Sequence, residues 1–124
     1  MPVKGLGTDI VEIARVASSL EQSARLAKRV LTPVELHIFE NHFEPARYLA
    51  KRWAAKEAAA KALGTGIGRG ISFQHFEITN DELGAPSLTL SNQAEELAKS
   101  KGIEHFHVSI SDEVNYAMAT VIYS

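Results

Sequence analysis

The sequence RWAAKEAAAK, at residues 52–61, predicts a helix around which the rest of the chain can pack. It contains five alanines and no glycine, proline or β-branched residue, so a helix is the expected local structure. At 100° per residue, several alanines share one narrow stripe along this helix, namely Ala54, Ala55, Ala58, Ala59 and Ala62. Because alanine side chains are small, another backbone segment can approach the helix closely along the stripe.

A different side of the same helix carries an acid and a base one turn apart. Glu57 and Lys61 in this orientation form a surface pair that stabilises a helix by about 0.2–0.5 kcal/mol, which is the simplest interpretation. The alternative is a site for phosphates and a metal ion. It is favoured by the surroundings of Glu57, which include a glycine-rich segment at residues 64–70 and the cations Arg52, Lys56 and Lys61.

The composition predicts a single soluble domain over residues 1–124. A chain of 124 residues with 45% hydrophobic residues can form one core. Its formal net charge of −2 gives no reason to expect nucleic-acid binding, and the lack of cysteine excludes disulfides and thiolate chemistry. The beginning, MPVKGLGTDIVEI, is too polar for a signal peptide, and no apolar run could span a bilayer. We therefore expect a cytoplasmic protein without a membrane partner.

Residues 2–11 are rich in strand-forming side chains and include one aspartate. Gly5 and Gly7 remove side chains at points where another segment must come close. Asp9 lies among apolar neighbours and has two interpretations. It caps a turn or the next helix, or it is a buried carboxylate that needs a partner such as a divalent cation.

Residues 12–30 predict one helix, or two helices with a break near residues 18–23. The side opposite the apolar stripe carries four cations, namely Arg15, Arg25, Lys28 and Arg29. A solvated helix face is the default interpretation. The alternative is a docking surface for an acidic protein, because clustered cations attract such a partner.

The remaining segments predict further helices and two hairpins. Residues 32–35 read as a capping box that starts a short helix ending near Asn41, and the long helix then runs from Pro45 to Leu63. Strands are expected at residues 73–79, 87–90, 105–111 and 116–123, with a helix at residues 91–101. The expected fold class is α+β, with a small antiparallel sheet packed with helices.

The glycine-rich segment at residues 64–70 follows a helix, which excludes a dinucleotide fingerprint, because that motif lies between a strand and a following helix. It is either a helix stop with a mobile loop or a loop that contacts phosphate or nucleotide. His105 and His107 face the same way on a predicted strand. Without a third ligand nearby they give only weak support for a metal site.

Several motifs, taken together, resemble one family. They are GLGTDIVE at residues 5–12, WAAKEAAAK at residues 53–61, Gly64-Thr65-Gly66, LGAP at residues 83–86 and HVSISDE at residues 107–113. In this order and at this chain length, they resemble the holo-[acyl-carrier-protein] synthases, the small bacterial 4′-phosphopantetheinyl transferases. The resemblance covers the whole chain.

The resemblance implies a reaction and the residues that perform it. Coenzyme A would donate its phosphopantetheine arm to a serine of apo acyl carrier protein in fatty-acid biosynthesis, with release of adenosine 3′,5′-bisphosphate. Asp9 and Glu57 match the family residues that hold Mg²⁺ on the coenzyme A pyrophosphate, and Mg²⁺ commonly takes only one or two protein carboxylates. Lys61 would bind the phosphates, and Glu57 would accept the serine proton. The other expected coenzyme A contacts are Arg52, Lys56, Gly64, Thr65 and Gly66.

The resemblance also implies partners. The acidic carrier protein would dock on Arg15, Arg25, Lys28 and Arg29, and members of this size are typically homotrimers with active sites between subunits. One departure is Asp112, because many members have a histidine at this point. Two alternatives stay open: a metal-dependent enzyme acting on another nucleotide or pyrophosphate, and a non-catalytic module that binds an acidic partner.

Overall fold

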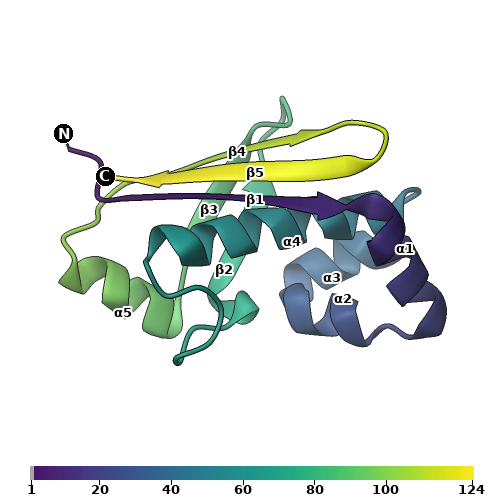
Figure 1. Ribbon diagram of the computed structural model, residues 1–124, viewed down its shortest axis with the longest axis horizontal. Helices are drawn as coiled ribbons and strands as arrows, with labels where there is room; N and C mark the ends of the chain where they lie inside the picture. Colours follow the sequence, from purple (N-terminus) through teal and green to yellow (C-terminus); the bar gives the residue numbers. More distant parts are fainter. Residues whose placement is uncertain (1) are drawn as a thin grey trace.

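The computed structural model describes residues 2–124 and contains a three-stranded antiparallel sheet with one long helix across its inner face (Figure 1). Strands β1 (Gly5–Glu12), β5 (Tyr116–Tyr123) and β4 (Phe106–Asp112) lie in the order β1-β5-β4. The long helix is α4 (Pro45–Ala62). The predicted α+β fold class is therefore confirmed.

Helix α4 packs so closely on β1 that two strand positions have no room for a side chain. A Cβ atom at Gly5 would collide with the carbonyl oxygen of Ala62, and one at Gly7 would collide with that of Ala58. The whole alanine stripe of α4 is buried. The predicted close approach of another backbone segment is confirmed at both glycines.

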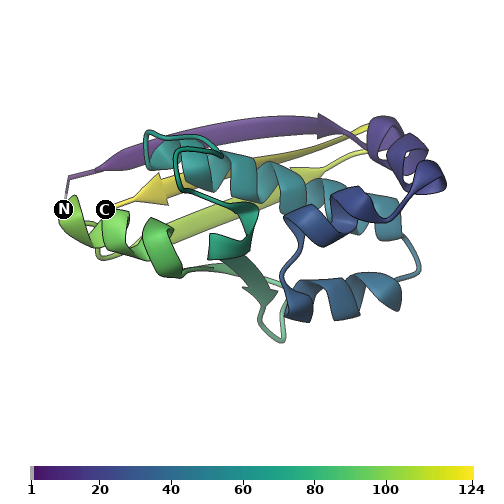
Figure 2. The same ribbon diagram turned by 90° about the horizontal axis from the view of Figure 1, so that it is seen from below.

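Three short helices pack at one end of α4, as Figures 1 and 2 both show. They are α1 (Ile13–Gln22), α2 (Arg25–Val30) and α3 (Pro33–Glu40), so the predicted break falls after Gln22. Helix α3 starts with the predicted capping box: the side-chain oxygen of Thr32 accepts from the Glu35 amide, and Glu35 accepts from the Thr32 amide at 2.9 Å. The caps read from the sequence therefore place the helix ends correctly.

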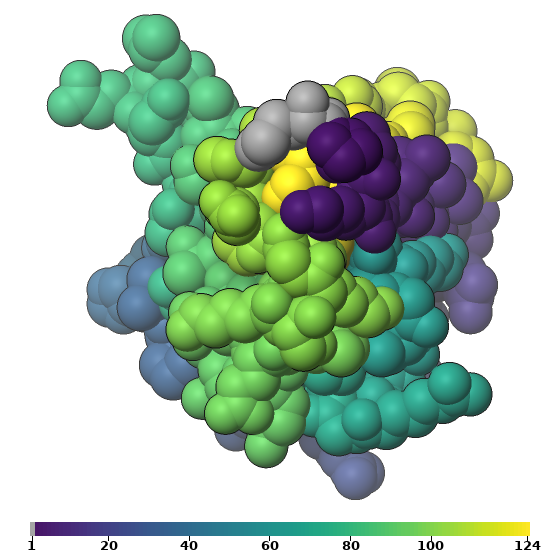
Figure 3. Space-filling view, turned by 90° about the vertical axis from the view of Figure 1, so that its left-hand side faces the viewer, coloured from purple at the N-terminus to yellow at the C-terminus, as the bar shows by residue number. Residues whose placement is uncertain are grey.

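A second, two-stranded sheet follows α4. It consists of β2 (Phe76–Asn80) and β3 (Pro86–Leu90), preceded by the short 3₁₀ helix η1 (Phe73–His75) and followed by α5 (Asn92–Ser100). The expected strand start at Phe73 is wrong, because Ser72 accepts a hydrogen bond from the Gln74 amide and turns the chain. The loop between β2 and β3 projects from the body of the molecule (Figure 3).

The outer face of the three-stranded sheet carries apolar side chains that the rest of the described chain leaves exposed. The register places Leu6 beside Ile122, and Ile10 beside Met118. Leu6 and Ile10 are each 64% exposed. A single copy of residues 2–124 thus has one buried sheet face, against α4, and one uncovered face. No helix within these residues is both long and apolar enough to cross a membrane.

Candidate active site

Asp9 and Lys61 meet where β1 passes along α4. The inward positions of β1 alternate, and Asp9 follows Gly5 and Gly7 on the side that faces the helix. The ammonium nitrogen of Lys61 lies 2.9 Å from the Asp9 Oδ1 atom and 3.1 Å from the Thr8 carbonyl oxygen. Two residues that are 52 positions apart in the sequence therefore form an ion pair at the surface.

Glu57 completes the group, because it lies with Asp9 in the wall of a cavity of about 240 Å³. The same wall contains Arg15, which was predicted to dock the partner, and four residues that were not predicted for the site, namely Ile10, Val11, Glu12 and Trp53. The spacing of Glu12 and Trp53 from the predicted site residues could have indicated that they belong to the site. Glu12 follows Asp9 by three positions at the end of a strand, and Trp53 precedes Glu57 by one helical turn.

The carboxylate of Glu57 lies in an unfavourable environment for a negative charge. Burial raises its pKa first of all, and the nearby Asp9 carboxylate raises it further. The indole of Trp53 and the positive charges of Lys61 and Arg29 act in the opposite direction. A divalent cation between the two carboxylates would relieve this repulsion, so their chemistry fits the implied metal.

The metal donors of the protein are few. Within residues 2–124, no group of three or more histidine, cysteine, aspartate or glutamate side chains could hold a metal ion. The two carboxylates of Asp9 and Glu57 are enough for Mg²⁺, because this ion completes its coordination with water and phosphate oxygens. The wall also contains the Trp53 indole nitrogen, which is buried and forms no hydrogen bond of ordinary geometry in the described chain. It is close enough to the Glu57 carboxylate to stabilise the charged form of that group.

Lys56 does not belong to the site, and its assignment to coenzyme A phosphates is wrong. Its side chain has 0% exposure, and its ammonium lies 2.5 Å from Glu35 Oε1, 2.7 Å from the Val30 carbonyl oxygen and 3.2 Å from that of Phe73. These three acceptors use all of its donors. Burial lowers the pKa of Lys56, and the Glu35 carboxylate opposes that shift. The residue joins α4 to its neighbours inside the molecule.

Arg52 lies on another side of α4, away from the cavity that contains Asp9. It is 4% exposed, donates to the Asn80 side-chain oxygen at 2.6 Å and lies over the ring of Tyr48. Both side chains line a second cavity of about 520 Å³, together with Arg47 and Lys51. The Arg52 Nε and Tyr48 hydroxyl atoms are buried there without a hydrogen-bond partner in the described chain.

The glycine-rich segment begins at the end of α4, close to Lys61. Gly64 and Gly66 have positive φ angles of 88° and 66°, so the helix stops where the sequence predicted. The Thr65 hydroxyl donates to the Gly66 carbonyl oxygen at 2.8 Å. Further along, Gly68 and Ile71 exchange two backbone hydrogen bonds around a tight turn.

The remaining predicted docking cations, Arg25, Lys28 and Arg29, are exposed on α2. Asp112 forms ion pairs with Arg47 at 2.9 Å and Lys51 at 3.7 Å. It therefore joins the β4–β5 hairpin to α4.

Comparison with known proteins identifies the family. The sequence profile of the 4′-phosphopantetheinyl transferase superfamily matches residues 5–121. The chain belongs to this superfamily. Among curated members, the transferase is similar to the holo-[acyl-carrier-protein] synthase of Shewanella piezotolerans, with 61% identity over 97% of both chains. It is 57% identical to that of Alteromonas mediterranea, over 98% of this chain and 97% of the relative.

Solved structures of the superfamily share the fold of this transferase. The holo-[acyl-carrier-protein] synthase of Neisseria meningitidis has a TM-score of 0.92 and 39% identity over 99% of both chains. The Helicobacter pylori enzyme, solved in complex with coenzyme A, has a TM-score of 0.83 and 32% identity over 96% of this chain and 99% of that one. The family resemblance seen in the motifs is confirmed.

Proposed function

We propose that this chain transfers the 4′-phosphopantetheine arm of coenzyme A to a serine of an apo acyl carrier protein, with release of adenosine 3′,5′-bisphosphate. The observation that carries the proposal is the meeting of Asp9, Glu57 and Lys61 between β1 and α4. It is supported by full-length relatives named holo-[acyl-carrier-protein] synthase.

In this reaction, Lys61 binds the pyrophosphate and stabilises the leaving group. Its side chain is half exposed, and its ammonium is held by Asp9 and the Thr8 carbonyl oxygen, so it is accessible to a phosphate from solvent. Glu57 accepts the proton of the carrier serine. Its carboxylate lines the same cavity as Arg15 of the proposed docking surface, which supports this role.

Asp9 and Glu57 are the residues that would hold Mg²⁺. When bound, the metal supplies positive charge that neutralises the phosphate oxygens. In its absence the two carboxylates repel each other, as the raised pKa of Glu57 indicates. Asp9 would hold the metal in addition to the Lys61 ammonium.

More distant parts of coenzyme A have two further contacts. The Gly64-Thr65-Gly66 loop follows directly after Lys61 on α4 and lies beside the nucleotide. Arg52 suits a phosphate remote from the pyrophosphate, because its unpaired Nε atom lies in a cavity with the cations Arg47 and Lys51.

The carrier protein docks on the cations of α1 and α2, namely Arg15, Arg25, Lys28 and Arg29. Arg15 also lines the cavity of Asp9 and Glu57, so the docking surface adjoins the reacting groups. We further propose a cytoplasmic role in fatty-acid biosynthesis and a homotrimer. The trimer is supported by the exposed apolar face of the three-stranded sheet.

The decisive experiment measures the intact mass of an apo acyl carrier protein after incubation with this protein and coenzyme A. We expect a gain of one phosphopantetheine arm with Mg²⁺ and none with a chelator. Glu57→Gln should lose at least about 100-fold in rate, the usual scale for a general base. Glu96→Gln, which changes an exposed acid on α5, is the matched control.

No mass gain from the folded wild-type protein would contradict the proposal. Turnover of another pyrophosphate without any carrier would instead indicate a different metal-dependent enzyme. Carrier binding without product, unchanged by Glu57→Gln, would indicate a non-catalytic module.

A further inference from the structure

Helix α2 is too short to hold its own position. It has six residues, and its N-cap residue, Ala24, has no side-chain acceptor, so that Ser23 alone accepts from the Arg25 amide, at 3.2 Å. Isolated helices of this length are unstable in water, so contacts from outside the helix must fix it. The helix nevertheless carries three exposed cations, namely Arg25, Lys28 and Arg29.

Two side chains from other elements hold the C-terminal end of α2. The side-chain amide of Gln74, in η1, lies 3.3 Å from the Lys28 carbonyl oxygen, 3.2 Å from that of Arg29 and 2.7 Å from that of Leu31. The buried ammonium of Lys56 donates to the Val30 carbonyl oxygen at 2.7 Å. The Gln74 side-chain amide has two N–H donors, so together with Lys56 it offers three outside donors to the four carbonyls of residues 28–31, at the end where helical carbonyls lack partners.

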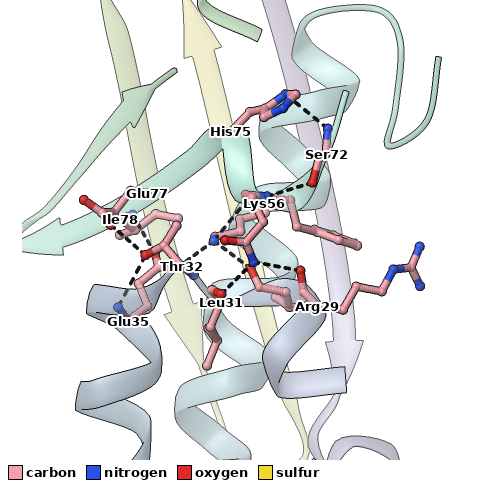
Figure 4. A network of polar contacts seen from close by, with 12 residues as sticks. Arg29, Leu31, Thr32, Glu35, Lys56, Ser72, His75, Glu77 and Ile78 are labelled. Carbon is pink, nitrogen blue, oxygen red and sulfur yellow. Dashed lines mark hydrogen bonds and ion pairs between the residues drawn. The ribbon is translucent and has the colours of Figure 1, made fainter. Parts of the chain in front are cut away.

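The backbone around Gln74 is fixed by its buried neighbours and by a local hydrogen bond. Its neighbours Phe73 and His75 are buried, and the backbone N–H of Gln74 donates to the Ser72 hydroxyl at 3.1 Å. The Glu35–Lys56 pair lies directly behind this turn, because Lys56 also donates to the Phe73 carbonyl oxygen (Figure 4).

The same turn also fixes one of the cations. The guanidinium of Arg29 lies over the Phe73 ring, 5.3 Å from its centroid, and its side chain points away from the buried network in Figure 4. Arg29 is close enough to Glu57 to lower the pKa of that carboxyl. The position of α2 therefore affects the cations available to a partner and their distance from the site.

We propose that Gln74 is a positioning residue for the carrier protein. Its side-chain amide holds the C-terminal end of α2 and so sets the direction of the docking cations. The inference rests on the proposed transferase function. Gln74 does not line the cavity of Asp9 and Glu57, and its side chain is exposed enough for replacement without a cavity in the core.

The test is Gln74→Met, which keeps the length of the side chain and removes the donor. Gln93→Met, at an exposed glutamine of α5 without a side-chain hydrogen bond in the described chain, is the matched control. We expect the KM for apo carrier protein to rise about fivefold, the loss of roughly one net hydrogen bond. The kcat and the KM for coenzyme A should change less than about twofold. Hydrogen exchange of the α2 amides should quicken, while that of α4 and β1 stays the same.

An unchanged KM for the carrier overturns the inference. So does a common change in kcat and both KM values with faster exchange throughout the chain, since that would show general destabilisation. If wild-type protein transfers no phosphopantetheine, the proposed function itself has failed, and the role of Gln74 in carrier docking fails with it.

Discussion

At the scale of single residues, Glu57 combines a proposed catalytic role with a cost in stability. Its pKa is raised by burial and by Asp9, so the folded protein binds this proton more tightly than the unfolded chain does. The free energy of unfolding must then fall as pH rises from the ordinary pKa of glutamate through the raised value, and stay reduced above it.

Glu57→Gln should therefore stabilise the protein at neutral pH in the absence of divalent cations. We expect a melting temperature up to about 4 °C higher at pH 7, a gain that disappears near pH 4. Thermal unfolding of both proteins between pH 4 and pH 8 is the measurement. A constant difference across this range would show that the charge of Glu57 is not responsible. Glu96→Gln is again the control.

The lysines of the central helix show why sequence predicted only part of the site. Lys56 and Lys61 both looked like surface cations beside Glu57, but Lys61 is exposed and Lys56 is buried. A helical pattern indicates which residues share a side, and it does not indicate how many sides are covered. Helix α4 is covered by β1 and β5 on one side and by α2, α3 and β2 on others.

At the scale of elements, the buried pair of Glu35 and Lys56 joins the α3 capping box to α4 and β2. Glu35 accepts from Lys56 and from the Thr32 amide through one oxygen, and from the Ile78 amide at 2.8 Å through the other. Removing one partner leaves a buried charge uncompensated.

Lys56→Met alone should cost about 3–5 kcal/mol of unfolding free energy, and the double variant Glu35→Met with Lys56→Met should recover part of it. The recovery is incomplete, because the Thr32 and Ile78 amides lose their acceptor. Urea denaturation of the wild type, both single variants and the double variant measures the coupling. Additive losses in the double variant would contradict an energetic link between the two residues.

The ends of elements were predicted where local chemistry decides them. The Thr32 capping box and the stop at Gly64 act within a few residues, and both are found as expected. The sequence indicated the two hairpins, β2–β3 and β4–β5, but not the place of β1 beside β5, because that pairing joins the two ends of the chain and has no local signal. Family motifs predicted that Asp9, Glu57 and Lys61 share one site, but the ion pair between Asp9 and Lys61 is known from the structure alone.

At the scale of the whole molecule, the uncovered sheet face should decide the assembly. Ile122 lies on that face beside Leu6 and is 36% exposed. Ile122→Glu should convert the proposed trimer to monomers, because a charge would be buried in the subunit contact. Sedimentation equilibrium measures the change. Val34→Glu, at an exposed position of α3, is the control. A wild-type monomer, or an Ile122→Glu protein of unchanged mass, would exclude this face as the contact.

The contact of Gly5 and Gly7 with the carbonyl oxygens of α4 determines how precisely the distance between β1 and α4 is fixed. Side chains between two elements can change rotamer, and the gap between the elements changes with them. Here the backbones touch directly, so atomic radii fix the spacing. The separation of Asp9 from Glu57 and Lys61 thus depends on the absence of side chains at the two glycines. Any relative that keeps both glycines should keep this spacing, however much the rest of its interior differs.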